Sequence, residues 1–112
     1  MQTFKETAET EGNPMYAVSR RYKTTASFDE INKKVKDGLV PLLKKINGFH
    51  AYRTVNLGNG HIASFSLFND KKSADEATQK AAEWIKGDPS VKKLLPEAPV
   101  VAGGEVGLNI TA

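Results

Sequence analysis

The residues best suited to chemistry lie in two short runs in the middle of the chain. His50 and Tyr52 alternate in the first run. Ser64 and Ser66 alternate in the second. Alternate residues of a β-strand point to the same side of a sheet, so each pair would present its side chains together. Imidazole, phenol and hydroxyl groups can exchange hydrogen bonds or move a proton, and the guanidinium of Arg20 can stabilise a negative charge. These groups could bind and activate a small organic molecule.

The composition limits this chemistry and the setting in which it occurs. The chain has 112 residues, of which 39% are hydrophobic and 26% charged, and it contains no cysteine. This describes one ordinary globular domain, without thiolate nucleophiles or Cys-ligated metals. The net charge of +3 is too small to mark a dedicated nucleic-acid binder, although the pI is about 9.2. No apolar run is long enough to span a membrane and no signal peptide is evident, so we expect a cytoplasmic protein.

Alternation and helix-start signals divide the chain into elements. Residues 1–14 are polar and predict a flexible N-terminal extension, followed by a single domain over residues 15–112. Strands are predicted at residues 15–22, 49–57, 61–69 and 100–110. Two capping boxes, beginning at Ser27 and Ser73, predict the starts of two helices that end near residues 46 and 87, with a further helical turn at residues 92–96.

The order of these elements predicts an α+β fold. Strand, helix, strand, strand, helix, strand is the order of a ferredoxin-like antiparallel sheet with both helices on one face. Pro41, with Gly38 before it, predicts a kink or break within the first helix, because proline cannot donate its backbone hydrogen bond.

The hairpin at residues 58–60 allows the sheet residues to be assigned to faces. A two-residue turn would mix polar and apolar side chains on both faces, whereas a three-residue loop separates them better. With the three-residue loop, we expect the helices to cover one set of residues: Phe49, Ala51, Val55, Leu57, Ala63, Phe65 and Leu67. The other set is left without cover: His50, Tyr52, Thr54, Asn56, Ile62, Ser64, Ser66 and Phe68. A mixed aromatic surface of this size marks an interface or a ligand groove, so we expect two sheets to pack face to face in a homodimer. The cavity between them would be lined by His50, Tyr52, Ser64, Ser66 and Phe68.

Several segments together resemble a known superfamily. The strand YAVSRRY, the helix segment VPLLKKI, and the runs NGFHAYRTV and IASFSLFND resemble the dimeric α+β barrel proteins. More narrowly, the chain is similar to small bacterial proteins related to the antibiotic-biosynthesis monooxygenases. The resemblance covers about residues 15–108. It implies a homodimer that binds a small apolar or aromatic molecule and, if it is an enzyme, oxidises that molecule without a cofactor.

We expect no cofactor and no metal. The Asn, Trp and His expected of a haem-degrading relative are missing from their strands and helix, and the two histidines fall on opposite faces in the preferred register. For an oxygenase of a phenolic substrate, Arg20 joins His50 and Tyr52 as a cavity candidate. No catalytic residue is carried over from the family.

Other classes of function remain as alternatives. The main one is a non-catalytic binding or oligomerisation module whose sheet interface is filled by side chains. A void of roughly 300 Å³ with Tyr52 or His50 directed into it would favour ligand binding instead. RNA binding ranks third, because the strand at residues 61–69 lacks the aromatic residues of an RNA-recognition motif, and no nucleic-acid or membrane partner is expected.

Overall fold

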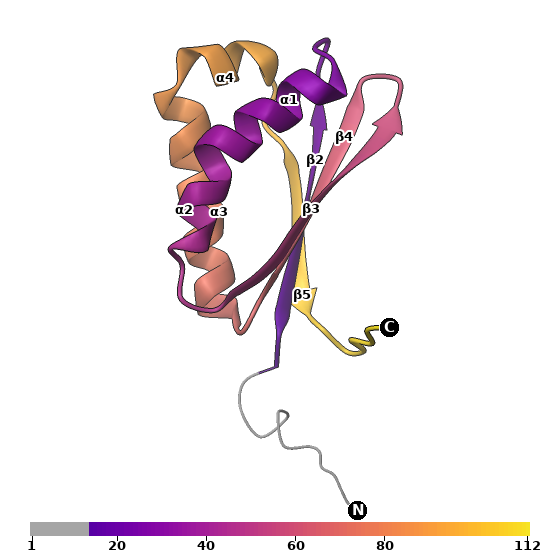
Figure 1. The fold of residues 1–112 in the computed structure, drawn as a ribbon, viewed down its shortest axis with the longest axis vertical. Coiled ribbons are helices and arrows are strands. Elements are labelled where there is room, and N and C mark those ends of the chain that lie inside the picture. The colour runs from indigo at the N-terminus through magenta and orange to yellow at the C-terminus, as the bar shows by residue number, and fades with distance from the viewer. Residues whose placement is uncertain (1–13) are drawn as a thin grey trace, which may run out of the picture.

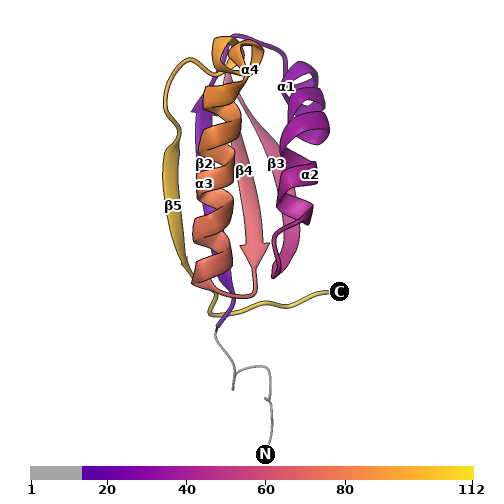
Figure 2. The ribbon, with the colours of Figure 1, turned by 90° about the vertical axis from the view of Figure 1, so that its left-hand side faces the viewer.

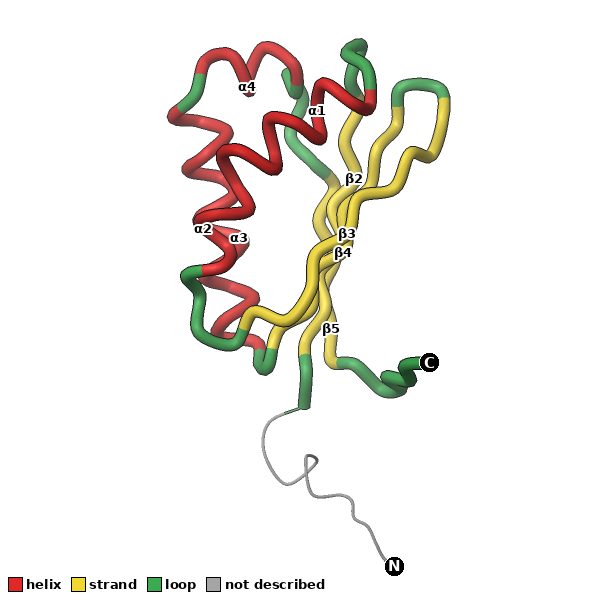
Figure 3. The backbone as a smooth tube through the Cα atoms, in the orientation of Figure 1, coloured by secondary structure: helices red, strands yellow, loops and turns green. Residues whose placement is uncertain are grey.

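The protein folds around one four-stranded antiparallel sheet. The computed structural model describes residues 14–112, so the predicted extension at residues 1–14 lies, apart from Pro14, outside the described residues. The strands lie in the order β3-β4-β2-β5, as Figure 2 shows. Figures 1 and 3 show the same sheet nearly edge-on, with the helices on one side of it. Their bounds are β2 Tyr16–Lys23, β3 Phe49–Gly58, β4 His61–Phe68 and β5 Val100–Glu105. This order confirms the predicted ferredoxin-like α+β fold.

The helices form a single layer on one face of the sheet, and Figure 2 shows this layer in front of the strands. Their bounds are α1 Phe28–Lys34, η2 Val35–Leu39, α2 Val40–Lys44, α3 Lys71–Gly87 and α4 Pro89–Leu94. The first three elements follow one another without a break, and their buried side chains recur at helical spacing: Ile31, Val35, Leu39 and Leu43. Helix α3 contributes the small side chains of Ala74, Ala77 and Ala81, which are also buried. Within the described residues, no helix is long and apolar enough to cross a membrane.

The predicted irregularity at Pro41 is a π-helical turn. In η2 the backbone N–H of Val40 donates to the carbonyl of Val35, five residues back. A wider turn just before Pro41 accommodates a residue that has no N–H and whose ring needs space. The helix changes direction between α1 and α2, as Figure 1 shows. Gly38 lies within this turn, where a β-carbon would collide with the indole of Trp84 on α3.

The hairpin has the predicted register. Thr54 lies opposite Ser64 and Asn56 opposite Ile62, as predicted, but Gly58 pairs with His61, so the connection is the two residues Asn59 and Gly60 and a register shift between Asn56 and Gly58 restores the predicted pairing. Gly58, Asn59 and Gly60 all have positive φ, at 86°, 54° and 77°. Glycine and asparagine accept this backbone region more readily than other residues, which is why the sequence signal was informative.

The prediction of which face the helices cover was wrong. Ile62, Ser64, Ser66 and Phe68 are buried beneath the helices, with exposures of 0–4%. Phe65 on the opposite face is 48% exposed. Alternation along the strands shows which residues share a face, but both sets contain apolar residues, so the pattern could not show which set meets the helices. The cavity predicted between two sheets therefore cannot be lined by Tyr52, Ser64, Ser66 and Phe68.

A β-bulge moves the first residues of β3 relative to the rest of the strand. The pairing between β3 and β4 shifts between Phe49 and Ala51, so Phe49 lies opposite Phe68. The Phe49 ring packs against the Phe68 ring with centroids 6.0 Å apart, on the covered side. The extra residue is His50, which is exposed and contacts the side chain of Asn69 through Nε2. His50 therefore does not lie on the same face as Tyr52, whereas the sequence predicted that both lie on the face without cover.

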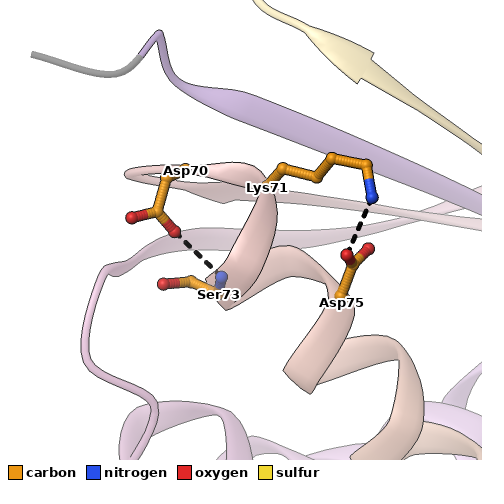
Figure 4. A network of polar contacts seen from close by, with 4 residues as sticks. All are labelled: Asp70, Lys71, Ser73 and Asp75. Carbon is orange, nitrogen blue, oxygen red and sulfur yellow. Dashed lines mark hydrogen bonds and ion pairs between the residues drawn. The ribbon is translucent and has the colours of Figure 1, made fainter.

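Two predicted boundaries also differ from the structure. Helix α3 begins at Lys71, and its N-cap is Asp70, whose side chain accepts a hydrogen bond of 2.9 Å from the backbone N–H of Ser73. Figure 4 shows this cap beside the Lys71–Asp75 ion pair of 2.8 Å on the first turn. The cap is thus three residues earlier than the predicted Ser73, because Asp is as good a capping residue as Ser. The last strand ends at Glu105, before the predicted residue 110.

Candidate functional site

A mostly apolar pocket lies between the covered face of the sheet and the helices α3 and α4. Its volume is about 240 Å³. The sheet contributes Arg20, Tyr22 and Val101, and we call this cavity the Arg20 pocket. The other walls come from α3, α4 and the segment before β5: Thr78, Ala81, Ala82, Ile85, Lys86, Lys92, Leu95, Pro96, Glu97, Ala98 and Pro99. Most of these side chains are apolar, as is typical of sites for small organic molecules.

Arg20 is the most unusual residue of the pocket. It is only 4% exposed, although arginine is rarely buried without a partner of opposite charge. Its Nη2 donates a hydrogen bond of 2.7 Å to the hydroxyl of Thr78 on α3. The ion pair found within residues 14–112 is Lys71–Asp75, so no carboxylate in this part of the chain pairs with Arg20. The side chain of Arg20 is thus largely shielded from water. Among the described residues it forms one hydrogen bond, to a neutral hydroxyl group.

Arg20 belongs to a polar row that crosses the sheet. Thr54 of β3 lies opposite Ser64 of β4, and Ser64 lies opposite Arg20 of β2. The Thr54 hydroxyl donates to Asn32 Oδ1 on α1, at 2.8 Å. The Ser64 hydroxyl is buried and has no hydrogen-bond partner of normal geometry among the described residues. Buried hydroxyls almost always have a partner, and the side chain near Ser64 that could serve as one is Tyr52.

Two tyrosines stand near the guanidinium. Burial raises the pKa of Tyr22 to about 12, against the opposing effect of the positive charge of Arg20. Burial also raises the pKa of Tyr52, while the nearby Ser64 hydroxyl and Arg20 act in the opposite direction. Both phenols therefore stay protonated at neutral pH, where they can donate a hydrogen bond and are poor bases.

The structure separates the predicted cavity residues into three groups. Arg20 lines the pocket, and Tyr52 and Ser64 lie close to Arg20 but not on the pocket wall. Ser66 and Phe68 are buried in the sheet, where the Ser66 hydroxyl donates to the Val18 carbonyl at 3.4 Å and Phe68 belongs to the core. His50 lies outside the site, on the exposed bulge.

Sequence reasoning missed both uncharged polar residues of the pocket, Tyr22 and Thr78. Tyr22 follows Arg20 by two residues on the same strand, so the alternation that grouped the other candidates would have identified it. Thr78 lies on α3, and no sequence signal links a helical threonine to a strand arginine 58 residues away. The described residues contain no group of three or more metal-ligating side chains.

Comparisons with known proteins define the class of fold. Neither a known family model nor a curated protein matches the sequence. Solved structures do match. A protein of unknown function from Nitrosomonas europaea has a TM-score of 0.66 at 17% identity, covering 88% of this chain and 96% of its own. A dimeric ferredoxin-like protein from an uncultured marine organism has a TM-score of 0.66 at 13% identity, covering 89% and 94%.

A third structure of the same fold is an enzyme. SnoaB, a cofactor-independent oxygenase from Streptomyces nogalater, matches with a TM-score of 0.60 at 10% identity, covering 88% of this chain and 96% of its own. The chain therefore has the ferredoxin-like fold of these proteins, which is the fold that the sequence resemblance implied. At these identities the likeness concerns the fold, and function must be argued from the site.

Proposed function

We propose that this protein binds a small, largely apolar organic molecule in the Arg20 pocket. The observation that carries this proposal is a charged side chain, 4% exposed, on the wall of an otherwise mostly apolar cavity of about 240 Å³. An apolar cavity with a few polar groups is the usual form of a ligand site. A purely structural interior would gain stability from an apolar residue at position 20, so the cost of burying the charge supports a functional role.

We further propose that the bound molecule is oxidised by dioxygen without a cofactor, as in the oxygenase of the same fold. Such a reaction is balanced when the substrate supplies all the electrons, so that a CH₂ group becomes a carbonyl and the second oxygen atom leaves as water. Transfer of a proton from the CH₂ group to water gives an electron-rich anion that can react with dioxygen, and a proton is taken up again when the second oxygen atom leaves as water. The protonated Tyr22 would donate a hydrogen bond to the oxygen of this anion, and the positive charge of Arg20 in the same pocket would favour its formation.

Two measurements test binding and oxidation separately. A thermal-shift screen of one- and two-ring aromatic compounds is expected to find ligands that raise Tm in a concentration-dependent manner. Oxidation is tested with the two-ring compound oxindole, whose CH₂ group becomes the second carbonyl of isatin, by following dioxygen consumption in metal-free buffer. Ligands without dioxygen consumption would favour a non-catalytic binding protein. A complete absence of ligands would contradict the proposed function.

We also propose that the sheet face turned away from the helices, the open face, forms a homodimer with a second copy of the chain. Its members follow from the strand pairing: Ala17, Ser19, Arg21, Ala51, Arg53, Val55, Ala63, Phe65, Leu67, Val100 and Ala102. Val55 is 39% exposed, Phe65 48% and Val100 70%. Exposed apolar side chains gathered on one face, here beside Arg21 and Arg53, are unfavourable in water, and a neighbour of the same fold is described as dimeric. This interaction retains the predicted face-to-face dimer but uses the opposite face of each sheet.

Light scattering coupled to size exclusion tests the dimer. The wild type is expected to elute as a dimer at micromolar concentration, and Phe65→Arg as a monomer, because the substitution places a further positive charge directly opposite Arg53 on the open face. Leu108→Arg is the matched control, since Leu108 is 80% exposed and lies beyond the last strand. A monomeric wild type would contradict this interface.

A further inference from the structure

The chemistry around Arg20 indicates what kind of molecule the pocket takes. A guanidinium remains positively charged at neutral pH, so Arg20 keeps its charge although it is 4% exposed. A buried charge is stable when a partner of opposite sign and hydrogen-bond acceptors surround it. In residues 14–112 the partner found is the neutral hydroxyl of Thr78, which occupies one N–H group at Nη2. The other N–H groups have no partner of normal geometry in this part of the chain.

The pocket around the guanidinium is also more positive than negative. Two lysines, Lys86 and Lys92, line it from α3 and α4, and Glu97 is the acidic residue on its wall. Both lysines and Glu97 are exposed, so they act at the pocket entrance through long-range attraction rather than through fixed contacts. A negatively charged molecule would be drawn towards the entrance and would meet Arg20 at the buried end.

The size and lining of the pocket restrict the rest of the molecule. An apolar cavity of about 150 Å³ can hold one benzene ring, so a pocket of about 240 Å³ has room for one or two rings. The body of the ligand would contact Ala81, Ala82 and Ile85 on α3. These contacts favour an apolar skeleton, and they offer no group that would bind a second charge.

We propose that the pocket selects organic carboxylates, with the carboxylate of the ligand paired to Arg20 and a flat apolar body of one or two rings packed against α3. The inference rests on the proposed function, because it names the class of molecule that the Arg20 pocket binds. A carboxylate fits better than a single anionic oxygen, because its two oxygens match the parallel N–H groups of a guanidinium. The Thr78 hydroxyl acts as a positioning group that holds one edge of the guanidinium and leaves the other for the ligand.

The test compares two probes that differ in charge and have nearly the same shape. 2-Naphthoate carries the carboxylate, and 2-naphthamide replaces it with a neutral amide. Isothermal titration calorimetry on the full chain is expected to give at least about tenfold tighter binding of the acid than of the amide. In Arg20→Met this preference should disappear. Arg20→Lys keeps the charge but loses the fork of N–H groups, so it should retain the preference and bind the acid less tightly than the wild type.

A matched control uses the neighbouring arginine. Arg21 lies on the open face, so Arg21→Met removes the same charge without touching the pocket and should keep the preference for the acid. Equal affinity for acid and amide in the wild type, or a preference that survives in Arg20→Met, would overturn the inference and leave the proposed pocket intact. If neither probe, nor the one-ring pair benzoate and benzamide, binds at millimolar concentration, the proposed function is overturned together with the inference.

Discussion

If the function of Arg20 is to bind a ligand, the ligand-free protein should become more stable when an uncharged residue replaces this arginine. In Arg20→Met the side chain keeps a similar length and loses its charge. The hydrogen bond of 2.7 Å to Thr78 is lost, which costs about 1.5–3 kcal/mol for a charged donor. Against this, burying one charge costs several kcal/mol even after local relaxation, and Arg20 as a whole residue is 4% exposed. The balance predicts that Arg20→Met is about 2 kcal/mol more stable than the wild type.

Urea unfolding followed by circular dichroism measures this difference directly. A gain of about 2 kcal/mol corresponds to a rise in Tm of about 8 °C for a domain of this size. The control is Lys36→Met, which removes one positive charge from an exposed position on the helix layer and should change stability by less than about 0.5 kcal/mol. If Arg20→Met is less stable than the wild type by about 1 kcal/mol or more, Arg20 has a structural role and the reasoning fails.

Two further predictions concern the sheet and the helix layer. The pKa of Tyr22 is about 12 in the folded protein, and its ordinary value is 10.0. The unfolded chain therefore loses the phenol proton at a lower pH than the folded protein does. Stability is therefore expected to fall by about 2–3 kcal/mol as the pH rises from about 10 to about 12. In Tyr22→Phe this part of the decline should be missing when urea unfolding is compared across the same range; an identical decline would rule out Tyr22 as its source. At Gly38, alanine improves helix propensity but its β-carbon collides with Trp84, so Gly38→Ala should lower stability by about 1–3 kcal/mol. Gly87→Ala is the control, because nothing lies within 4 Å of its β-carbon position, and equal effects of the two substitutions in thermal unfolding would contradict the packing argument.

Local signals predicted the order and pairing of the elements well. The turn at residues 58–60 determined the strand register, because its backbone conformation requires glycine or asparagine, and Ser27 does cap α1 by accepting from the N–H of Glu30. Pro41 correctly predicted an irregular helix, although its form as a π-helical turn depends on how the helix packs.

Features that depend on distant contacts could not be predicted. Alternation placed Tyr52 and Ser64 on one face, but whether the helices or a second subunit cover that face depends on contacts between distant segments. The bulge that turns His50 outward breaks the alternation on which the prediction relied. The pocket itself was missed because its far wall comes from α3, where Thr78 meets Arg20 across 58 residues of chain.

The most direct test of ligand binding in the Arg20 pocket is to map where a ligand contacts the protein. We would titrate the ¹⁵N-labelled protein with 2-naphthoate and follow the backbone amide signals. The expected result is that the shifts concentrate on the residues around the pocket, such as Thr78, Ala82 and Ala98. Shifts confined to the open face around Phe65, or no shifts at millimolar ligand, would contradict the proposal that this protein binds small organic molecules between its sheet and its helices.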